Sequence, residues 1–138
     1  MDFIDPTKEQ FAVFKSLPRG HRLHMLNLVR LRKQAEYPDG RVATGLDAYR
    51  AYGRESAPIF KRVGGHIHWI GRFEHTLIGP LDERWDLVFI AEYPSADAFI
   101  EMLRDPVYRD AVKHRQAAVE DSRLIRVEPG TPGEGFGE

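Results

Sequence analysis

The chain has 138 residues, a formal net charge of −1 and no cysteine, and its sequence pI is about 6.6. The length fits one domain. The lack of a basic excess argues against a nucleic-acid partner, and the lack of cysteine excludes disulfides, thiolate catalysis and cysteine-bound metals. The first residues have neither the basic start nor the apolar stretch of a signal peptide, and no apolar run approaches the roughly 20 residues that span a bilayer. We therefore expect a cytoplasmic protein with no membrane and no nucleic-acid partner.

The N-terminal segment, residues 1–20, predicts a helical arm. Asp5 is expected to cap a short helix that has Pro6 at its first position. Phe11 and Phe14 follow at a spacing of three, as on one face of a helix. We expect this arm to pack on the main body or on a partner subunit.

Residues 21–128 predict one domain with the order strand, helix, strand, strand, helix, strand. Alternating apolar residues indicate the strands, and a Ser, Thr or Asp before an apolar run indicates the start of each helix. Pro58 predicts a kink or break in the first of these helices. The tail, residues 129–138, holds six glycines or prolines and is expected to be disordered. The predicted strands cover 22–30, 66–75, 85–93 and 124–127, and the predicted helices cover 44–62, 95–104 and 106–120.

This order predicts an α+β, ferredoxin-like βαββαβ fold with a four-stranded antiparallel sheet and an extra N-terminal helix. The first strand is apolar on both faces, with Leu23 and Met25 on one and Leu26 and Leu28 on the other. The helices form one layer and cover one face only. A large exposed apolar face is unusual, and the same face of a second copy, related by a two-fold axis, is its simplest cover. We therefore expect a homodimer that forms through the sheet face.

Several short motifs follow one another in a defined order. Glu92-Tyr93-Pro94-Ser95 ends the third strand, Pro106-Val107-Tyr108 opens the last helix, Arg115 comes seven residues after that tyrosine, and Gly64-Gly65 precedes the second strand. Over residues 22–128 this order resembles the domain-of-unknown-function family 1330 of the dimeric α/β-barrel superfamily. The resemblance implies a ferredoxin-like fold, a dimeric α/β barrel and a pocket between helices and sheet, and it implies no established activity. The helical arm, a longer loop after the first strand and Pro106 depart from the family pattern.

Arg115 is the residue that most suggests binding chemistry. It falls on the apolar stripe of the last helix, four residues after Ala111 and three before Ala118. A buried guanidinium needs an anionic partner. Arg115 therefore either clamps an acidic substrate or has a structural role, pairing with an internal acid such as Glu92 or stacking on Tyr108.

Asn27 is a polar residue on an apolar strand face, and a buried amide needs partners from its neighbours or from a ligand. In the superfamily that the chain resembles, oxygenases and haem-degrading enzymes place an Asn on the first strand, a Trp on the third and often a His on a helix. Asn27 and Trp85 are similar in placement. The helix after the third strand has no His before His114, which comes too late to match, so the analogy with haem-degrading enzymes rests on the fold alone.

His66 and His68 lie two residues apart on the second strand, so alternation places them on one face and Trp69 on the other. Two imidazoles about 7 Å apart along a strand form a metal site only with a third ligand, which His24 or Glu92 could supply from other strands. General acid–base chemistry by His68 and a solvent-facing or interface position are the alternatives. We predict no metal and no cofactor.

The favoured hypothesis is a cofactor-independent enzyme, an isomerase, lyase or monooxygenase-like catalyst, acting on a small acidic or aromatic molecule. Arg115 is expected to hold an acidic group, Asn27 to orient a carbonyl or oxyanion, and His68 to move a proton. Two alternatives stay open: a non-catalytic small-ligand-binding or stress-related dimeric module, and a haem-handling enzyme. The residues expected to line the ligand pocket are Tyr49, Trp85, Glu92 and Tyr108.

Overall fold

The structure is a computed structural model that describes residues 2–137. No helix within these residues combines the length and the hydropathy needed to cross a membrane. In chain order the elements are α1 (Lys8–Ser16), β1 (Leu23–Leu31), α2 (Gly45–Arg62), β2 (His66–Gly71), β3 (Leu87–Tyr93), α3 (Ala96–Arg104), α4 (Pro106–Ala118) and β4 (Val119–Val127).

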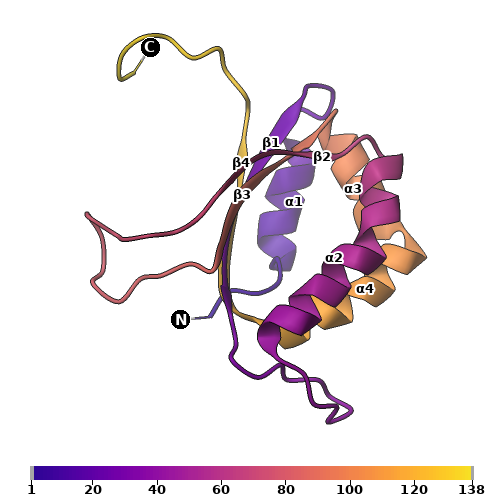
Figure 1. Cartoon of the computed structure of the whole chain (residues 1–138). Helices are drawn as coiled ribbons and strands as arrows, with labels where there is room; N and C mark the ends of the chain where they lie inside the picture. Colours follow the sequence, from indigo (N-terminus) through magenta and orange to yellow (C-terminus); the bar gives the residue numbers. More distant parts are fainter. Residues whose placement is uncertain (1, 138) are drawn as a thin grey trace.

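The four strands form one antiparallel sheet in the order β2-β3-β1-β4. With the βαββαβ connectivity, this order is the ferredoxin-like arrangement, so the predicted α+β fold is confirmed. Figure 1 shows the sheet nearly edge-on, with the helices on one side of it. Residues 128–137 form no helix or strand and lead away from the body of the molecule. The predicted disorder of this tail stays a prediction.

The sheet has two different faces, which we call the helix face and the open face. On β1, Leu23, Met25 and Val29 point to the helix face and are buried, whereas Leu26 and Leu28 point to the open face and are half-buried. This division agrees with the alternation predicted for the first strand. We define the apolar part of the open face by Leu26, Leu28, Trp69, Val88, Ile90, Ile125 and Val127, which the strand registers place on one side.

A β-bulge in β2 changes which way its side chains point. Ile67 pairs with Ala91, but the next pair joins Trp69 to Ile90, so His68 has no residue opposite it. An inserted residue of this kind reverses the alternation beyond it. Trp69 therefore lies on the same face as His68, and the predicted placement of Trp69 on the opposite face was wrong.

The helix starts follow local capping signals. Thr44, Ser95 and Asp105 each accept a hydrogen bond from a backbone N–H two or three residues further on, as N-cap residues do. For α1 the cap is Thr7, whose hydroxyl oxygen accepts from the Gln10 N–H at 3.1 Å. The prediction of Asp5 as the cap was wrong by two residues.

The long helix α2 is continuous from Gly45 to Arg62. Of the kink or break predicted near Pro58, the break therefore does not occur. The helix ends before Gly64, which has a φ of 89°. A residue with a side chain would be strained in this conformation. Tyr49 and Tyr52 lie on the face of α2 that the sheet and α4 cover.

Candidate functional site

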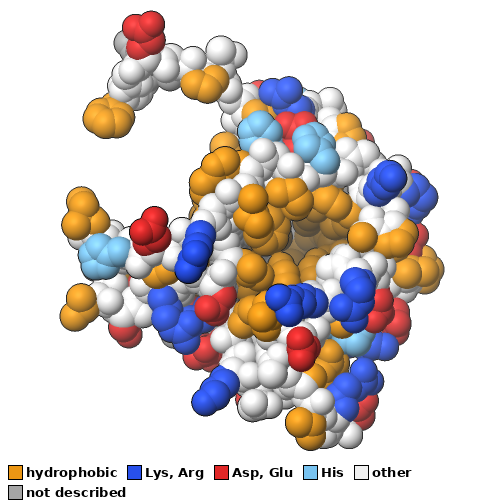
Figure 2. Space-filling view, in the orientation of Figure 1, with side chains coloured by type: hydrophobic (Ala, Val, Ile, Leu, Met, Phe, Trp, Pro, Cys, Tyr) orange, Lys and Arg blue, Asp and Glu red, His pale blue; other side chains and the backbone are white. Residues whose placement is uncertain are grey.

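A cavity of about 460 Å³ lies between the helix face of the sheet and the helices. Figure 2 shows a hollow there, surrounded by hydrophobic side chains. A volume of this size with a mostly apolar lining and few polar groups is typical of small-molecule sites. The apolar lining includes Met25, Phe60, Phe89, Phe99, Leu103 and Val112.

Three of the tyrosines that line the cavity come from helices: Tyr49 and Tyr52 on α2, and Tyr108 on α4. The Tyr52 and Tyr108 hydroxyl oxygens share a hydrogen bond of 2.8 Å. Burial raises the pKa of all three hydroxyls above the ordinary tyrosine value, an effect that the positive charge of Arg115 opposes. The hydroxyls therefore stay protonated at neutral pH and can donate hydrogen bonds.

Arg115 comes from α4 and lines the same cavity. Its guanidinium donates to the Ile4 carbonyl oxygen and, at 3.2 Å, to the Ser122 hydroxyl. These two bonds use two of its five N–H donors. Within residues 2–137 no carboxylate forms an ion pair with it, and Glu92, the acid considered as its partner, lies on the opposite face of the sheet.

Asn27 also lines the cavity, from the helix face of β1. Its side-chain N–H donates to the Met25 carbonyl oxygen at 3.0 Å, which fixes the amide along its own strand. Among the residues that the structure describes, its side-chain oxygen has no hydrogen-bond donor. That oxygen is therefore available to a ligand.

The N-terminal arm closes part of the cavity. Ile4, Asp5 and Pro6 are among the lining residues. The arm is held to β4, because the Phe3 N–H donates to the Asp121 carboxylate at 2.8 Å and the Ser122 hydroxyl donates to the Phe3 carbonyl oxygen at 2.7 Å. Further along the arm, the Phe14 ring packs 5.3 Å from the Phe99 ring of α3.

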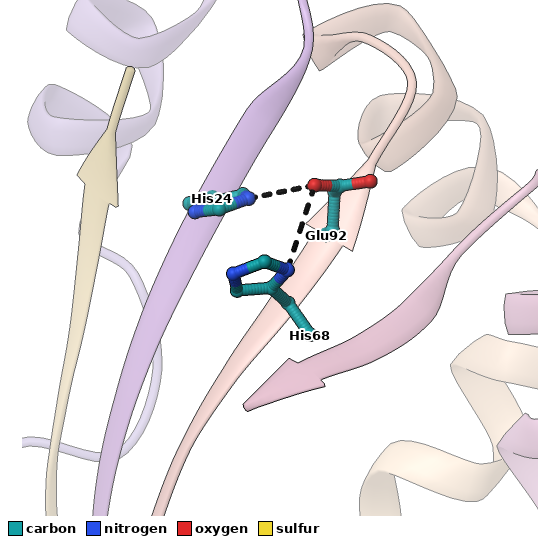
Figure 3. Close-up of side chains that lie close together, drawn as sticks. All are labelled: His24, His68 and Glu92. Carbon is teal, nitrogen blue, oxygen red and sulfur yellow. Dashed lines mark hydrogen bonds and ion pairs between the residues drawn. The ribbon is translucent and has the colours of Figure 1, made fainter. Parts of the chain in front are cut away.

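A second group of polar side chains lies on the open face, at the end of the sheet where β1 begins. Figure 3 shows His24, His68 and Glu92 pointing toward one another from three adjacent strands. His24 Nε2 lies 2.7 Å from Glu92 Oε1, and His66 Nε2 lies 3.3 Å from Glu92 Oε2. The hydrogen bond with His24 is the main reason that the pKa of Glu92 is lowered, so the carboxylate is ionised.

The structure brings four of the seven predicted site residues to one cavity and places three elsewhere. His68 and Glu92 lie on the open face, on the other side of the sheet from Arg115. Trp85 is buried, with its ring 5.5 Å from the Arg123 guanidinium, and does not line the cavity. The four residues that share the cavity are Asn27, Tyr49, Tyr108 and Arg115.

The helical histidine His114 does not line the cavity either. It is buried, with Nδ1 2.6 Å from the Tyr37 hydroxyl and Nε2 2.7 Å from the Glu55 carboxylate. It therefore ties the loop after β1 to α2 and α4. No histidine is among the lining residues in the described part of the chain, so this cavity offers a haem iron no axial imidazole.

Two contributions to these sites were not expected from the sequence. One is the cavity wall formed by the arm, which carries no sequence motif. The other is that His24 and Glu92 both meet His68, whereas only one of the two was expected to join His66 and His68. The order of strands in a ferredoxin-like sheet places the third strand between the first and the second, and this order, applied to the predicted strands, could have found that meeting.

Comparisons with known proteins agree with this architecture. The chain is 65% identical to the methylated RPA0582 protein, with a TM-score of 0.94 over 96% of this chain and 98% of that one. It is 64% identical to an RPA0582 protein of unknown function from Rhodopseudomonas palustris, with a TM-score of 0.92 over 96% and 100% of the two chains. No curated protein matches the chain.

A family model described as a domain of unknown function, DUF1330, matches residues 43–128, more than half of the chain. The match covers α2 to β4 and leaves the arm and β1 outside it. It agrees with the family that the order of short motifs indicated. The chain belongs to the DUF1330 family.

Proposed function

We propose that the cavity is the active site of a cofactor-independent enzyme, an isomerase, lyase or monooxygenase-like catalyst, acting on a small apolar or aromatic molecule with an acidic group. The guanidinium of Arg115 carries this proposal. It is a half-buried positive charge in the wall of an apolar cavity, and no carboxylate within residues 2–137 neutralises it. Such a charge favours an anionic ligand group, because a charge-assisted hydrogen bond is strong where water is excluded.

The other polar groups of the cavity support the same assignment. The protonated hydroxyls of Tyr49 and of the Tyr52–Tyr108 pair are donors, and the Asn27 oxygen is an acceptor. Donors held in place around a carbonyl stabilise the negative charge that develops on its oxygen during enolisation or oxygenation. His68 lies on the other face, so we assign proton donation in the cavity to the tyrosines.

The binding step is tested by replacing Arg115 with Gln, which keeps a polar side chain and removes the charge. We expect 2-naphthoate, a probe with an apolar ring and a carboxylate, to bind the variant about 10- to 100-fold more weakly. This range corresponds to a charge-assisted hydrogen bond of roughly 1.5–3 kcal/mol. Isothermal titration calorimetry measures it, with the neutral 2-naphthalenemethanol as the matched probe whose affinity should change little.

Lys113→Gln is the control variant, because it removes an exposed positive charge of the same helix that does not line the cavity. It should bind 2-naphthoate nearly as well as the wild type. Equal wild-type affinity for the acid and the alcohol would contradict the assignment of Arg115. Loss of the folded state in Arg115→Gln, seen by circular dichroism, would instead make the residue structural.

Catalysis is tested separately from binding. Small molecules released from freshly purified protein by denaturation can be identified by mass spectrometry and then incubated with the protein in air. Conversion of such a molecule into a product supports an enzyme. Tight binding with no change in the molecule would support the alternative of a non-catalytic ligand-binding module.

We further propose that the active unit is a homodimer that pairs two open faces. Trp69, Ile125 and Val127 are 44–48% exposed on that face, beside the half-buried Leu26 and Ile90. Figure 1 shows no helix on that side of the sheet. A second copy supplies a matching apolar surface by two-fold symmetry.

A further inference from the structure

We propose that His24, His68 and Glu92 form a binding site for a divalent transition-metal ion, of which zinc is the representative. The site lies on the open face of the sheet, on the other side from the cavity. It is therefore independent of the activity proposed for the cavity, and either can fail without the other, although the site shares its face with the proposed dimer contact.

The first argument is the convergence of the donor atoms. One nitrogen of each imidazole and one carboxylate oxygen of Glu92 all lie within 4.8 Å of one another. His24 Nε2 is 2.7 Å and His68 Nδ1 is 3.9 Å from the same Glu92 oxygen. Ligand atoms around a tetrahedral zinc ion are about 2.0–2.2 Å from the metal, so donors that already lie this close together are placed to share one ion.

The second argument is that the backbone is shaped to bring His68 to this place. In a regular ladder His68 would stand opposite Ile90, one step away from the Glu92 side chain on the same face. The bulge leaves His68 unpaired, and its ring lies 4.4 Å from the ring of His24, across the intervening strand β3. Bulges often serve to re-aim a side chain at a functional site.

The third argument is the pattern of exposure. The side chains of His24 and Glu92 are 13% and 15% exposed and are held by their strands, whereas that of His68 is 50% exposed. Three protein ligands with one side open to solvent match a zinc site that keeps its fourth position for water or another ligand. An ion can therefore reach the site of a single chain from solution, before a second copy covers the open face.

Two neighbouring groups affect the charge of the site. His66 Nε2 lies 3.3 Å from the second Glu92 oxygen and can orient the carboxylate, as second-shell groups do. Arg22 lies 3.5 Å from the first oxygen and disfavours a cation there. Its side chain is 60% exposed, so it can turn into solvent when an ion binds.

The donor set selects the kind of ion. Two imidazole nitrogens and one carboxylate oxygen suit zinc, cobalt(II) and nickel(II). Calcium and magnesium require shells composed mainly of oxygen and are expected to bind poorly. Two of the three protein ligands are therefore nitrogen atoms and one is an oxygen atom.

Cobalt(II) is the probe, because its visible absorption reports coordination by nitrogen and oxygen ligands directly. The chelator-treated full-length protein should bind one cobalt(II) per chain with a visible absorption band, and zinc should displace it. His68→Ala and Glu92→Gln should each weaken binding at least about 100-fold, beyond the 10- to 100-fold typical of second-shell changes. The melting temperature of the wild type should rise with added zinc, since an ion that binds only the folded state stabilises it.

His75→Ala is the matched control, because His75 is an exposed histidine in the loop after β2, outside the cluster. It should leave the absorption band and the zinc-induced thermal shift unchanged. Retention of the band in Glu92→Gln would overturn the proposal and point to simple chelation by His66 and His68. A wild-type protein that binds no cobalt(II) would leave the cluster as a hydrogen-bonded network only.

Discussion

The paired hydroxyls of Tyr52 and Tyr108 lie 2.8 Å apart in the cavity wall. One belongs to α2 and the other to α4, so the bond also joins two neighbouring helices. Because both groups are protonated, each can donate to the other or to a ligand. The pair therefore both joins the two helices and supplies polar groups to the cavity wall.

Removing one hydroxyl leaves the other without its partner. We expect Tyr108→Phe to lower the free energy of unfolding by about 1–2 kcal/mol, the usual cost of an unpaired buried polar group. The double variant Tyr52→Phe, Tyr108→Phe should be less destabilised than the sum of the two single variants. Urea unfolding of all four proteins measures the coupling, and strictly additive losses would show that the two hydroxyls do not interact.

At this scale, four of the seven predicted site residues share one cavity, and their functional roles stay a prediction. Helical spacing is local, so it put Tyr49, Tyr108 and Arg115 on faces that meet the sheet, and strand alternation did the same for Asn27. His68, Trp85 and Glu92 lie outside that cavity, because their surroundings depend on contacts between segments far apart in the sequence. The carboxylate of Glu92 is occupied by histidines of neighbouring strands rather than by Arg115.

Among the elements, the N-terminal arm is held in part through one carboxylate, that of Asp121. The Asp121 carboxylate accepts hydrogen bonds from the Phe3 N–H, the Ser122 N–H and the Arg123 guanidinium, at 2.8–2.9 Å. Burial by itself raises the pKa of Asp121, but the bonds from Phe3 and Arg123 outweigh it, and the pKa lies below the ordinary value of 3.8. The charged form is therefore the form that holds the arm.

Asp121→Asn should destabilise the protein by about 1–3 kcal/mol near neutral pH, since it removes a charge-assisted acceptor. A carboxyl whose pKa is lower in the folded state stabilises the fold fully above its unfolded pKa and loses this contribution as the pH falls through its folded pKa. The stability gap between wild type and variant should thus be constant above about pH 5 and shrink below about pH 4. Urea unfolding across that range measures it, and a gap that does not shrink would exclude Asp121 as the source.

Element boundaries were predicted within a few residues where the signal was local. Thr44, Ser95 and Asp105 cap the helices that they were expected to start. The bulge at His68 could not be predicted, because the strand sequence is compatible with uninterrupted alternation and only the pairing with β3 fixes the register. This inserted residue determines which face of the sheet Trp69 lies on and how closely His68 approaches Glu92.

On the scale of the whole molecule, the open face sets the expected assembly. Ile125 is 45% exposed there, and a charge at this position would be buried in the proposed dimer. Ile125→Glu should weaken dimerisation by roughly 3 kcal/mol or more, the cost of a buried unpaired charge. Light scattering after size exclusion should then give the 15.9 kDa mass of one chain.

Val107→Glu is the control for that experiment. Val107 is also an exposed aliphatic residue, but it lies on α4, away from the sheet face. The variant should keep the mass of the wild type. A wild-type protein that is itself monomeric would contradict the proposed dimer. A dimer that persists in Ile125→Glu would show that the interface lies elsewhere.

Because the arm closes part of the cavity, the identity of a ligand cannot simply be carried over from one family member to another. Ile4, Asp5 and Pro6, with Met25 and Asn27 of β1, supply part of the lining, yet all precede the residues 43–128 that match the DUF1330 family. Family membership therefore describes only some of the walls that a ligand meets. A substrate identified for another member can be assigned to this protein only if that member also has an N-terminal arm and a first strand that line the cavity in the same way.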